Sequence, residues 1–117
     1  MNRDQILKRI SEAVGLKRQG KFEEARQIYE NLDNSNPNNP IILKSWAKTL
    51  VCLRMYDLAG TYFMKAAIQF KKEFNEGSAW QCNDQFNTIQ NRFEYPEDFK
   101  EYVFHTSGGI IKDAKLD

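Results

Sequence analysis

The feature that most constrains the fold is an internal repeat, in which the chain matches itself at an offset of 34 residues. Six residue pairs match at this offset: Ala13 and Ala47, Leu16 and Leu50, Phe22 and Tyr56, Ala25 and Ala59, Tyr29 and Phe63, Leu32 and Ala66. In both copies a small residue precedes an aromatic residue by four positions, which places the two on one face of a helix. The sequence therefore predicts two copies of one helical unit, in which the small residue lets a neighbouring helix approach.

These residues resemble the tetratricopeptide repeat (TPR), which combines this period with a turn glycine, an alanine four residues before an aromatic residue and a closing proline. The first repeat covers about 6–39, with Gly20 in its turn and Pro37 near its end, and the second covers about 40–73. The chain departs from the pattern at three positions: Glu12 replaces a leucine, Arg54 the turn glycine and Lys71 the closing proline. The resemblance implies an all-α fold, a right-handed α-α superhelix of TPR-like helical hairpins.

The two repeats are expected to contain four helices, at about 3–18, 22–33, 39–53 and 56–75. Between the repeats, the segment from Asp33 to Pro40 is rich in Asn and Pro, which favour turns and disfavour helix in the residue before each proline. We expect this break to set the stacking of the repeats and to bind nothing.

A fifth helix is predicted over 78–93. Apolar residues recur there at helical spacing: Cys82, Phe86, Ile89 and Phe93. Ser78 is the expected N-cap, and the amide-rich polar face is expected to shield the end of the stack from solvent. Trp80 lies 34 residues after Trp46, and we expect it in the core.

Residues 1–93 are thus predicted to form one TPR-like domain, and residues 94–117 to add a short helix or strand and a flexible tail. Pro96 with acidic residues behind it favours a helix start, although the stretch EYVFHT is also compatible with a strand. Ile110 and Ile111 are the only anchors that we expect in the tail.

The net charge of +1 hides an alternation of charged segments. Residues 41–72 carry six basic and one acidic side chain, whereas 73–104 carry two basic and seven acidic ones. This pattern lacks the overall basic excess of a nucleic-acid binder. The apolar runs are too short to span a bilayer and the N-terminus lacks the apolar core of a secretory signal, so we expect a cytoplasmic protein with no membrane contact.

The residues that could carry chemistry are few and scattered. His105 is the only histidine, and Cys52 and Cys82 are far apart in the sequence. No spacing argues for a carboxylate pair, a nucleophile with a base, or a zinc site. We therefore expect no enzyme activity, no metal and no cofactor, and we expect both cysteines to be buried or half-buried free thiols.

In a stack of such hairpins, the first helix of each repeat lines the concave groove. The candidate partner-binding residues on these helices are Ile10, Val14, Lys17, Lys44 and Lys48, with Ile41 and Val51 beside the last two. TPR proteins that hold chaperone C-termini use a carboxylate clamp with Lys and Asn at the positions of Ile10 and Val14 and Asn at that of Lys48. This chain lacks the clamp, so its groove is expected to be apolar at one end and basic at the next turn.

Three alternatives compete with this site. Lys44 and Lys48 can form an ordinary solvated helix face, and Ile10 and Val14 can pack against the helix at 22–33 or an N-terminal neighbour. The acidic segment 94–101 can also fold back into the groove as a built-in plug.

The function expected from this reading is a non-catalytic protein- or peptide-binding TPR module, acting as an adaptor, scaffold or assembly chaperone for a partner segment that carries acidic groups. One alternative is a small protein inhibitor or immunity-like antagonist of one partner. Another is an RNA-contacting helical repeat that uses a set of basic residues: Lys17, Arg18, Lys21, Lys44 and Lys48. Homodimerisation stays open because roughly three repeats are usually needed for a stable stack.

Overall fold

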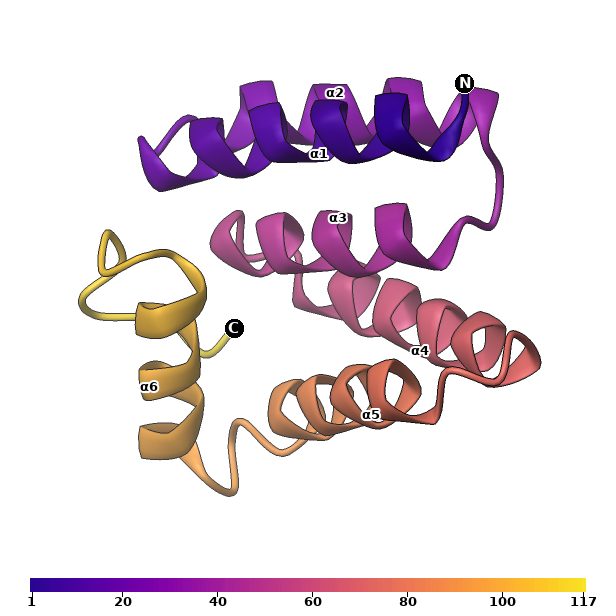
Figure 1. Ribbon diagram of the computed structural model, residues 1–117. Coiled ribbons are helices and arrows are strands. Elements are labelled where there is room, and N and C mark those ends of the chain that lie inside the picture. Colours follow the sequence, from indigo (N-terminus) through magenta and orange to yellow (C-terminus); the bar gives the residue numbers. More distant parts are fainter.

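In the computed structural model, which describes residues 1–117, the chain forms six helices and no strands (Figure 1). The helices are α1 (Arg3–Arg18), α2 (Phe22–Ser35), α3 (Pro40–Cys52), α4 (Tyr56–Lys72), α5 (Glu76–Gln90) and α6 (Pro96–Thr106). The predicted all-α fold is confirmed. Helices α1 and α2 form one antiparallel hairpin and α3 and α4 form the next, and α1, α3 and α5 run in the same direction (Figure 1).

The Asn/Pro break ends one hairpin and starts the next by local chemistry. Pro40 occupies the first turn of α3, where its missing N–H costs nothing. The Asn39 side chain accepts hydrogen bonds from the backbone N–H groups of Ile41 and Ile42, at 3.0 and 3.4 Å. The start of α3 is therefore fixed by residues of the break itself.

Four of the helices end in the same conformation. The residue after the C-cap has a positive φ in each: Gly20 (81°), Arg54 (61°), Phe74 (59°) and Gly108 (69°). The next backbone N–H then bonds to the carbonyl five residues earlier, at 2.8 to 2.9 Å, as in a Schellman motif. Arg54 thus adopts the conformation of the turn glycine that it replaces. Phe74 explains why α4 ends at Lys72 and does not reach residue 75 as predicted.

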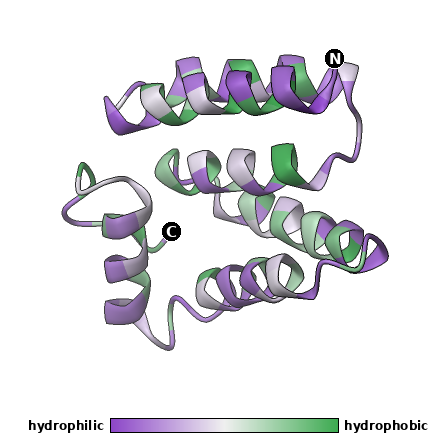
Figure 2. Cartoon of the chain, in the orientation of Figure 1, coloured by the Kyte–Doolittle hydropathy of each residue, from purple (hydrophilic) through white to green (hydrophobic).

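The core is one continuous cluster centred on α3 and α4. These two helices carry more hydrophobic residues than α1, α5 or α6 (Figure 2). Ten of the twelve residues that define the repeat are buried: Ala13, Ala25, Tyr29, Leu32, Ala47, Leu50, Tyr56, Ala59, Phe63 and Ala66. Between α4 and α5, Gly60 faces the ring of Phe86, and a methyl group there would lie 3.4 Å from the ring, in ordinary van der Waals contact. The small residues therefore set the close approach of successive helices.

Helix α5 begins and ends earlier than predicted. It runs from Glu76 to Gln90, and its cap is Asn75, whose side chain accepts from the Ser78 N–H at 3.1 Å. Ser78 is therefore not the N-cap, and Phe93 lies beyond the helix end and is 63% exposed. The inner face of α5 is apolar as expected, and its amide-rich face is open to solvent.

The prediction that Trp80 is a core residue is wrong, because its side chain is 68% exposed. Its counterpart Trp46 is buried against Tyr62 of the hairpin partner α4, with ring centroids 4.6 Å apart. Helix α5 has no such partner, since α6 stands across the stack instead of packing back along α5 (Figure 1). The tryptophan of the repeat thus recurs in the sequence as Trp80, but no hairpin partner covers it there.

Helix α6 begins at Pro96 as predicted, and the strand alternative for residues 101–106 is wrong. The prediction that Ile110 and Ile111 are the only anchors of the tail is also wrong. Ala114 is buried, the Tyr56 hydroxyl donates to the Lys115 carbonyl, and Arg92 donates to the Leu116 carbonyl. These contacts bring the C-terminus back beside the second hairpin.

Candidate binding groove on the concave face

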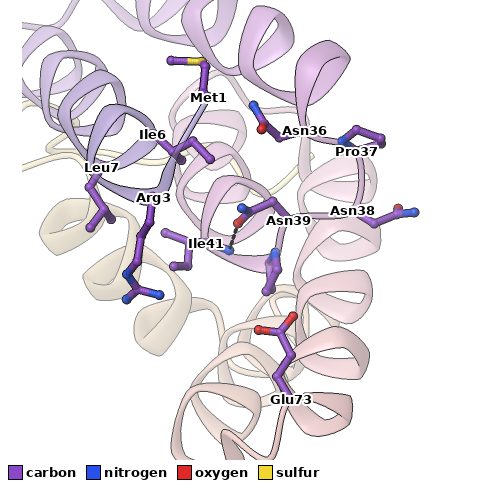
Figure 3. A pocket seen from close by; sticks show the side chains of 11 residues that line it. Met1, Arg3, Ile6, Leu7, Asn36, Pro37, Asn38, Asn39, Ile41 and Glu73 are labelled. Carbon is purple, nitrogen blue, oxygen red and sulfur yellow. Dashed lines mark hydrogen bonds between the residues drawn. The ribbon is translucent and has the colours of Figure 1, made fainter.

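Three adjoining hollows, which we together call the groove, are lined by residues of α1, α3 and α5 and their neighbours. At one end lies a pocket of about 440 Å³, which we call the hinge pocket, lined by residues 36–41 together with Met1, Arg3, Ile6, Leu7 and Glu73 (Figure 3). At the other end lies a pocket of about 480 Å³, the closed-end pocket, lined by Lys17, Lys48, Trp80, Gln81, Asp84, Gln85, Tyr102, His105 and Thr106. A hollow of about 370 Å³ between them shares Arg3, Ile41 and Glu73 with the hinge pocket and Lys48 with the closed-end pocket.

Helix α3 supplies the floor of this groove. Ile41, Lys44, Ser45 and Lys48 line the middle hollow and follow the spacing i, i+3, i+4, i+7 that places residues on one helix face. Ile41 thus flanks the two lysines as predicted. Val51, expected on their other side, is fully buried instead and belongs to the core.

Helix α6 closes one end of the groove by standing across the ends of α3 and α5 (Figure 1). The Lys17 ammonium donates to the Thr106 carbonyl at 2.8 Å, which ties α6 to α1. The Tyr102 hydroxyl donates to Gln85 at 3.0 Å, which ties α6 to α5. The residues that line the closed-end pocket lie as far apart in the sequence as Lys17 and Thr106, so the pocket exists only in the folded chain.

The groove carries the positive charges of three lysines, and the carboxylates of Glu73 and Asp84 also line it. None of Lys17, Lys44 and Lys48 takes part in a salt bridge, and the Lys44 ammonium donates to the Gln81 side-chain oxygen at 2.6 Å. Burial lowers the pKa of Lys48, and the nearby charges of Lys44 and Lys17 lower it further. Burial also lowers the pKa of Lys17. The lowered pKa values mean that the surroundings disfavour the protonated lysines, which a nearby anion would stabilise.

Of the five candidate residues, the structure gathers the three lysines along the groove and separates the two apolar ones from it. Ile10 is 8% exposed and belongs to the core, and Val14 is half-buried against that core, which favours the packing alternative for both. Apolar surface in the groove comes instead from Leu7 and Ile41 at the hinge pocket.

Several lining residues escaped the sequence reasoning. The match with Trp46 predicts a core position for Trp80, and Tyr102, His105 and Thr106 enter the site only through the position of α6. The Asn/Pro break, expected to bind nothing, lines the hinge pocket. Its richness in exposed amides was the one available signal, since such groups can hydrogen-bond an extended chain.

The alternative in which the acidic segment 94–101 fills the groove is wrong. Glu97 lies 3.7 Å from Lys100 and Glu101 lies 3.6 Å from His105, both within α6 itself. The acidic side chains of this segment are exposed, and none pairs with Lys44 or Lys48. Helix α6 thus closes the end of the groove with Tyr102 and a backbone carbonyl, and leaves the lysines without a counter-ion.

Both cysteines are buried free thiols, as predicted. Burial raises the pKa of the Cys52 thiol to about 11, so its reactive thiolate form is disfavoured near neutral pH. No group of three or more His, Cys, Asp or Glu side chains is placed to hold a metal ion. A bilayer-spanning helix is also missing, since none of the six is both long and apolar enough.

Comparison with known proteins gives no match, whether to a family model, to a curated protein or to a solved structure. The functional interpretation therefore depends on the geometry of the groove.

Proposed function

We propose that this chain is a non-catalytic, TPR-like protein-binding module whose concave groove holds a segment of a protein partner, as an adaptor or assembly chaperone does. The observation that carries the proposal is the groove itself, with three lysines that lack carboxylate partners and an exposed tryptophan beside them. Unpaired, partly buried charge and exposed aromatic surface both cost free energy in the unbound protein. A partner segment with acidic and apolar side chains would relieve both costs.

Support for the TPR-like part of the proposal comes from the helical hairpins. Two hairpins follow one another at the repeat offset, and the same positive-φ helix end recurs after α1, α3 and α4. Helix α5 then occupies the place of the first helix of a third repeat. This arrangement supplies three parallel helices for one groove, although the chain contains only two full repeats.

The test is a charge reversal in the floor of the groove. Lys44→Glu with Lys48→Glu should abolish capture of acidic protein partners from the native source, and the melting temperature should stay near that of the wild type because neither lysine holds a salt bridge. The matched control is Lys8→Glu with Lys65→Glu, which changes the net charge equally at two exposed positions outside the groove. Unchanged capture by the groove variant, measured by quantitative mass spectrometry of pull-downs, would contradict the proposal.

The salt dependence of binding separates this function from the RNA-contacting alternative. Several phosphate contacts would give a steep linear loss of log affinity with log salt concentration. A groove that combines apolar contacts with two or three lysines should give a shallow slope. A steep slope together with capture of RNA would favour the alternative.

A further inference from the structure

We propose that the groove reads a two-anchor motif, in which an apolar side chain enters the hinge pocket and a carboxylate binds Lys48 and Lys17, with about two residues of extended chain between them. This inference rests on the proposed function and adds to it the composition and spacing of the segment bound. It follows from the different chemistry of the two ends of the groove and from the straight helical floor that joins them.

The hinge pocket suits an apolar side chain with peptide groups on either side. Its apolar lining consists of Met1, Ile6, Leu7 and Ile41, of which Ile6 is buried (Figure 3). Leu7 is 38% exposed although it lies on a helix beside the core. The rim is polar, with the side-chain oxygen of Asn36, the side-chain NH2 of Asn39 and the guanidinium of Arg3, which forms no salt bridge. The Asn36 NH2 donates to the Leu32 carbonyl and the Asn39 oxygen caps α3. Such a rim can bond the backbone of an extended segment whose side chain fills the pocket.

The closed-end pocket suits an anion. Lys17 and Lys48 both line it, Lys44 lies one helical turn away, and none of the three has a carboxylate partner. Asp84 lines the same pocket without forming a salt bridge to either lysine. A carboxylate seated between Lys17 and Lys48 would therefore supply the missing counter-charge, and Trp80 would cover the aliphatic part of its side chain.

The spacing follows from helix geometry. Ile41, which lines the hinge pocket, and Lys48, which lines the closed-end pocket, are seven residues apart on α3. At 1.5 Å per residue the helix separates them by about 10 Å. An extended chain covers about 3.3 Å per residue, so it spans this distance in about three steps. The preferred motif thus has about two residues between the apolar and the acidic one.

The test uses acetylated and amidated synthetic peptides that contain one Leu and one Glu-Glu pair in a Gly/Ser background. Zero, two or five residues separate Leu from the acidic pair, in both sequence orders, and binding to the full chain is measured by fluorescence anisotropy. We expect the tightest binding at two intervening residues in at least one order. Relative to that peptide, Leu→Ser should weaken binding roughly tenfold and Glu→Gln at both positions about threefold to tenfold.

Protein variants assign each anchor to its pocket. Leu7→Ser should remove the preference for Leu over Ser in the peptide, and Lys48→Gln should remove the preference for Glu over Gln, whereas each should leave the other preference intact. The exposed residues Ile68 and Lys8, neither of which lines the groove, provide the matched controls Ile68→Ser and Lys8→Gln. Circular dichroism checks that all four variants stay folded.

Three results would overturn the inference. Peptide affinity does not depend on the number of residues between Leu and the acidic pair, or no peptide binds measurably. Alternatively, Leu7→Ser removes the preference for Glu, or Lys48→Gln removes the preference for Leu. If Lys44→Glu with Lys48→Glu still loses its captured partners in those cases, the proposed function stands without the motif. If partner capture is also unchanged, both fail.

Discussion

Lys48 carries its charge in surroundings that disfavour it. It is half-buried in the floor of the groove, between Lys44 on its own helix and Lys17 on α1, and no carboxylate pairs with it. A residue placed only for stability would be better replaced by an uncharged side chain of similar length. Keeping a lysine here costs stability, which supports the proposal that the groove binds an anionic group.

Replacing this lysine gives a prediction with a defined pH dependence. The folded state lowers the pKa of Lys48 below its ordinary value of 10.5, so the protonated form destabilises the fold at pH 7, and this penalty disappears as the pH rises toward 10.5. Lys48→Met should therefore raise the melting temperature at pH 7, and its advantage should shrink toward pH 10.5. Thermal denaturation at several pH values checks this, with the exposed Lys8→Met as control. An advantage that is constant with pH would show that packing of the methionine, not relief of charge, is responsible.

At the scale of a single element, both the local sequence and the tertiary packing determine where each helix ends. Gly20 allows a left-handed residue at no steric cost, whereas Arg54 and Phe74 adopt the same conformation without that freedom. The chain accepts this strain because the turn that follows must let the next helix pack back against the core. Helix propensity alone predicted that α4 continues to residue 75, and the need to start α5 ended it at Lys72.

Phe74 gives the corresponding prediction. Its φ is 59° and its side chain is 91% exposed, so it stabilises nothing that would compensate for the strain. Phe74→Gly should stabilise the protein by about 1 kcal/mol, since a left-handed conformation costs roughly 1–2 kcal/mol in a residue with a Cβ atom. Urea denaturation measures the change. Phe74→Ala removes the ring but keeps the strain, and equal stabilisation by both variants would refute the backbone explanation.

At the scale of the whole molecule, α6 and the tail turn an open stack of helices into a groove with one closed end. Lys17 holds α6 through the Thr106 carbonyl, and the tail returns to Tyr56 of the second hairpin, whose ring also meets Phe99 of α6 edge to face at 5.0 Å. The closed end, and with it half of the proposed recognition site, thus depends on contacts between the two ends of the chain.

The tail provides the prediction at this scale. Ala114 is buried, so Ala114→Arg should expel residues 107–117 from the surface of the second hairpin. Hydrogen exchange of the tail amides should become faster, and the melting temperature should fall by several degrees because the bonds to Tyr56 and Arg92 are lost. The neighbouring Asp113→Arg, at an exposed position, should change neither. Equal exchange in Ala114→Arg and the wild type would mean that the tail is already detached.

The sequence by itself determined the parts of this protein that depend on periodicity. The repeat at 34 residues fixed the two hairpins, their buried small and aromatic residues, and the face of α3 that carries Lys44 and Lys48, because helix geometry converts spacing directly into a shared face. The start of α6 at Pro96 is likewise determined by neighbouring residues in the sequence.

Only the tertiary structure decided which repeat positions are covered by a neighbour. Trp46 and Trp80 are equivalent in sequence, but Tyr62 lies over the first and nothing lies over the second, so one is core and the other lines the groove. Ile10 shows the opposite difference, because it is expected in the groove and lies in the core. The physical reason is the same for both: burial depends on which helix packs next, and where a chain departs from its repeat, as α6 does, that neighbour is set by contacts far apart in sequence.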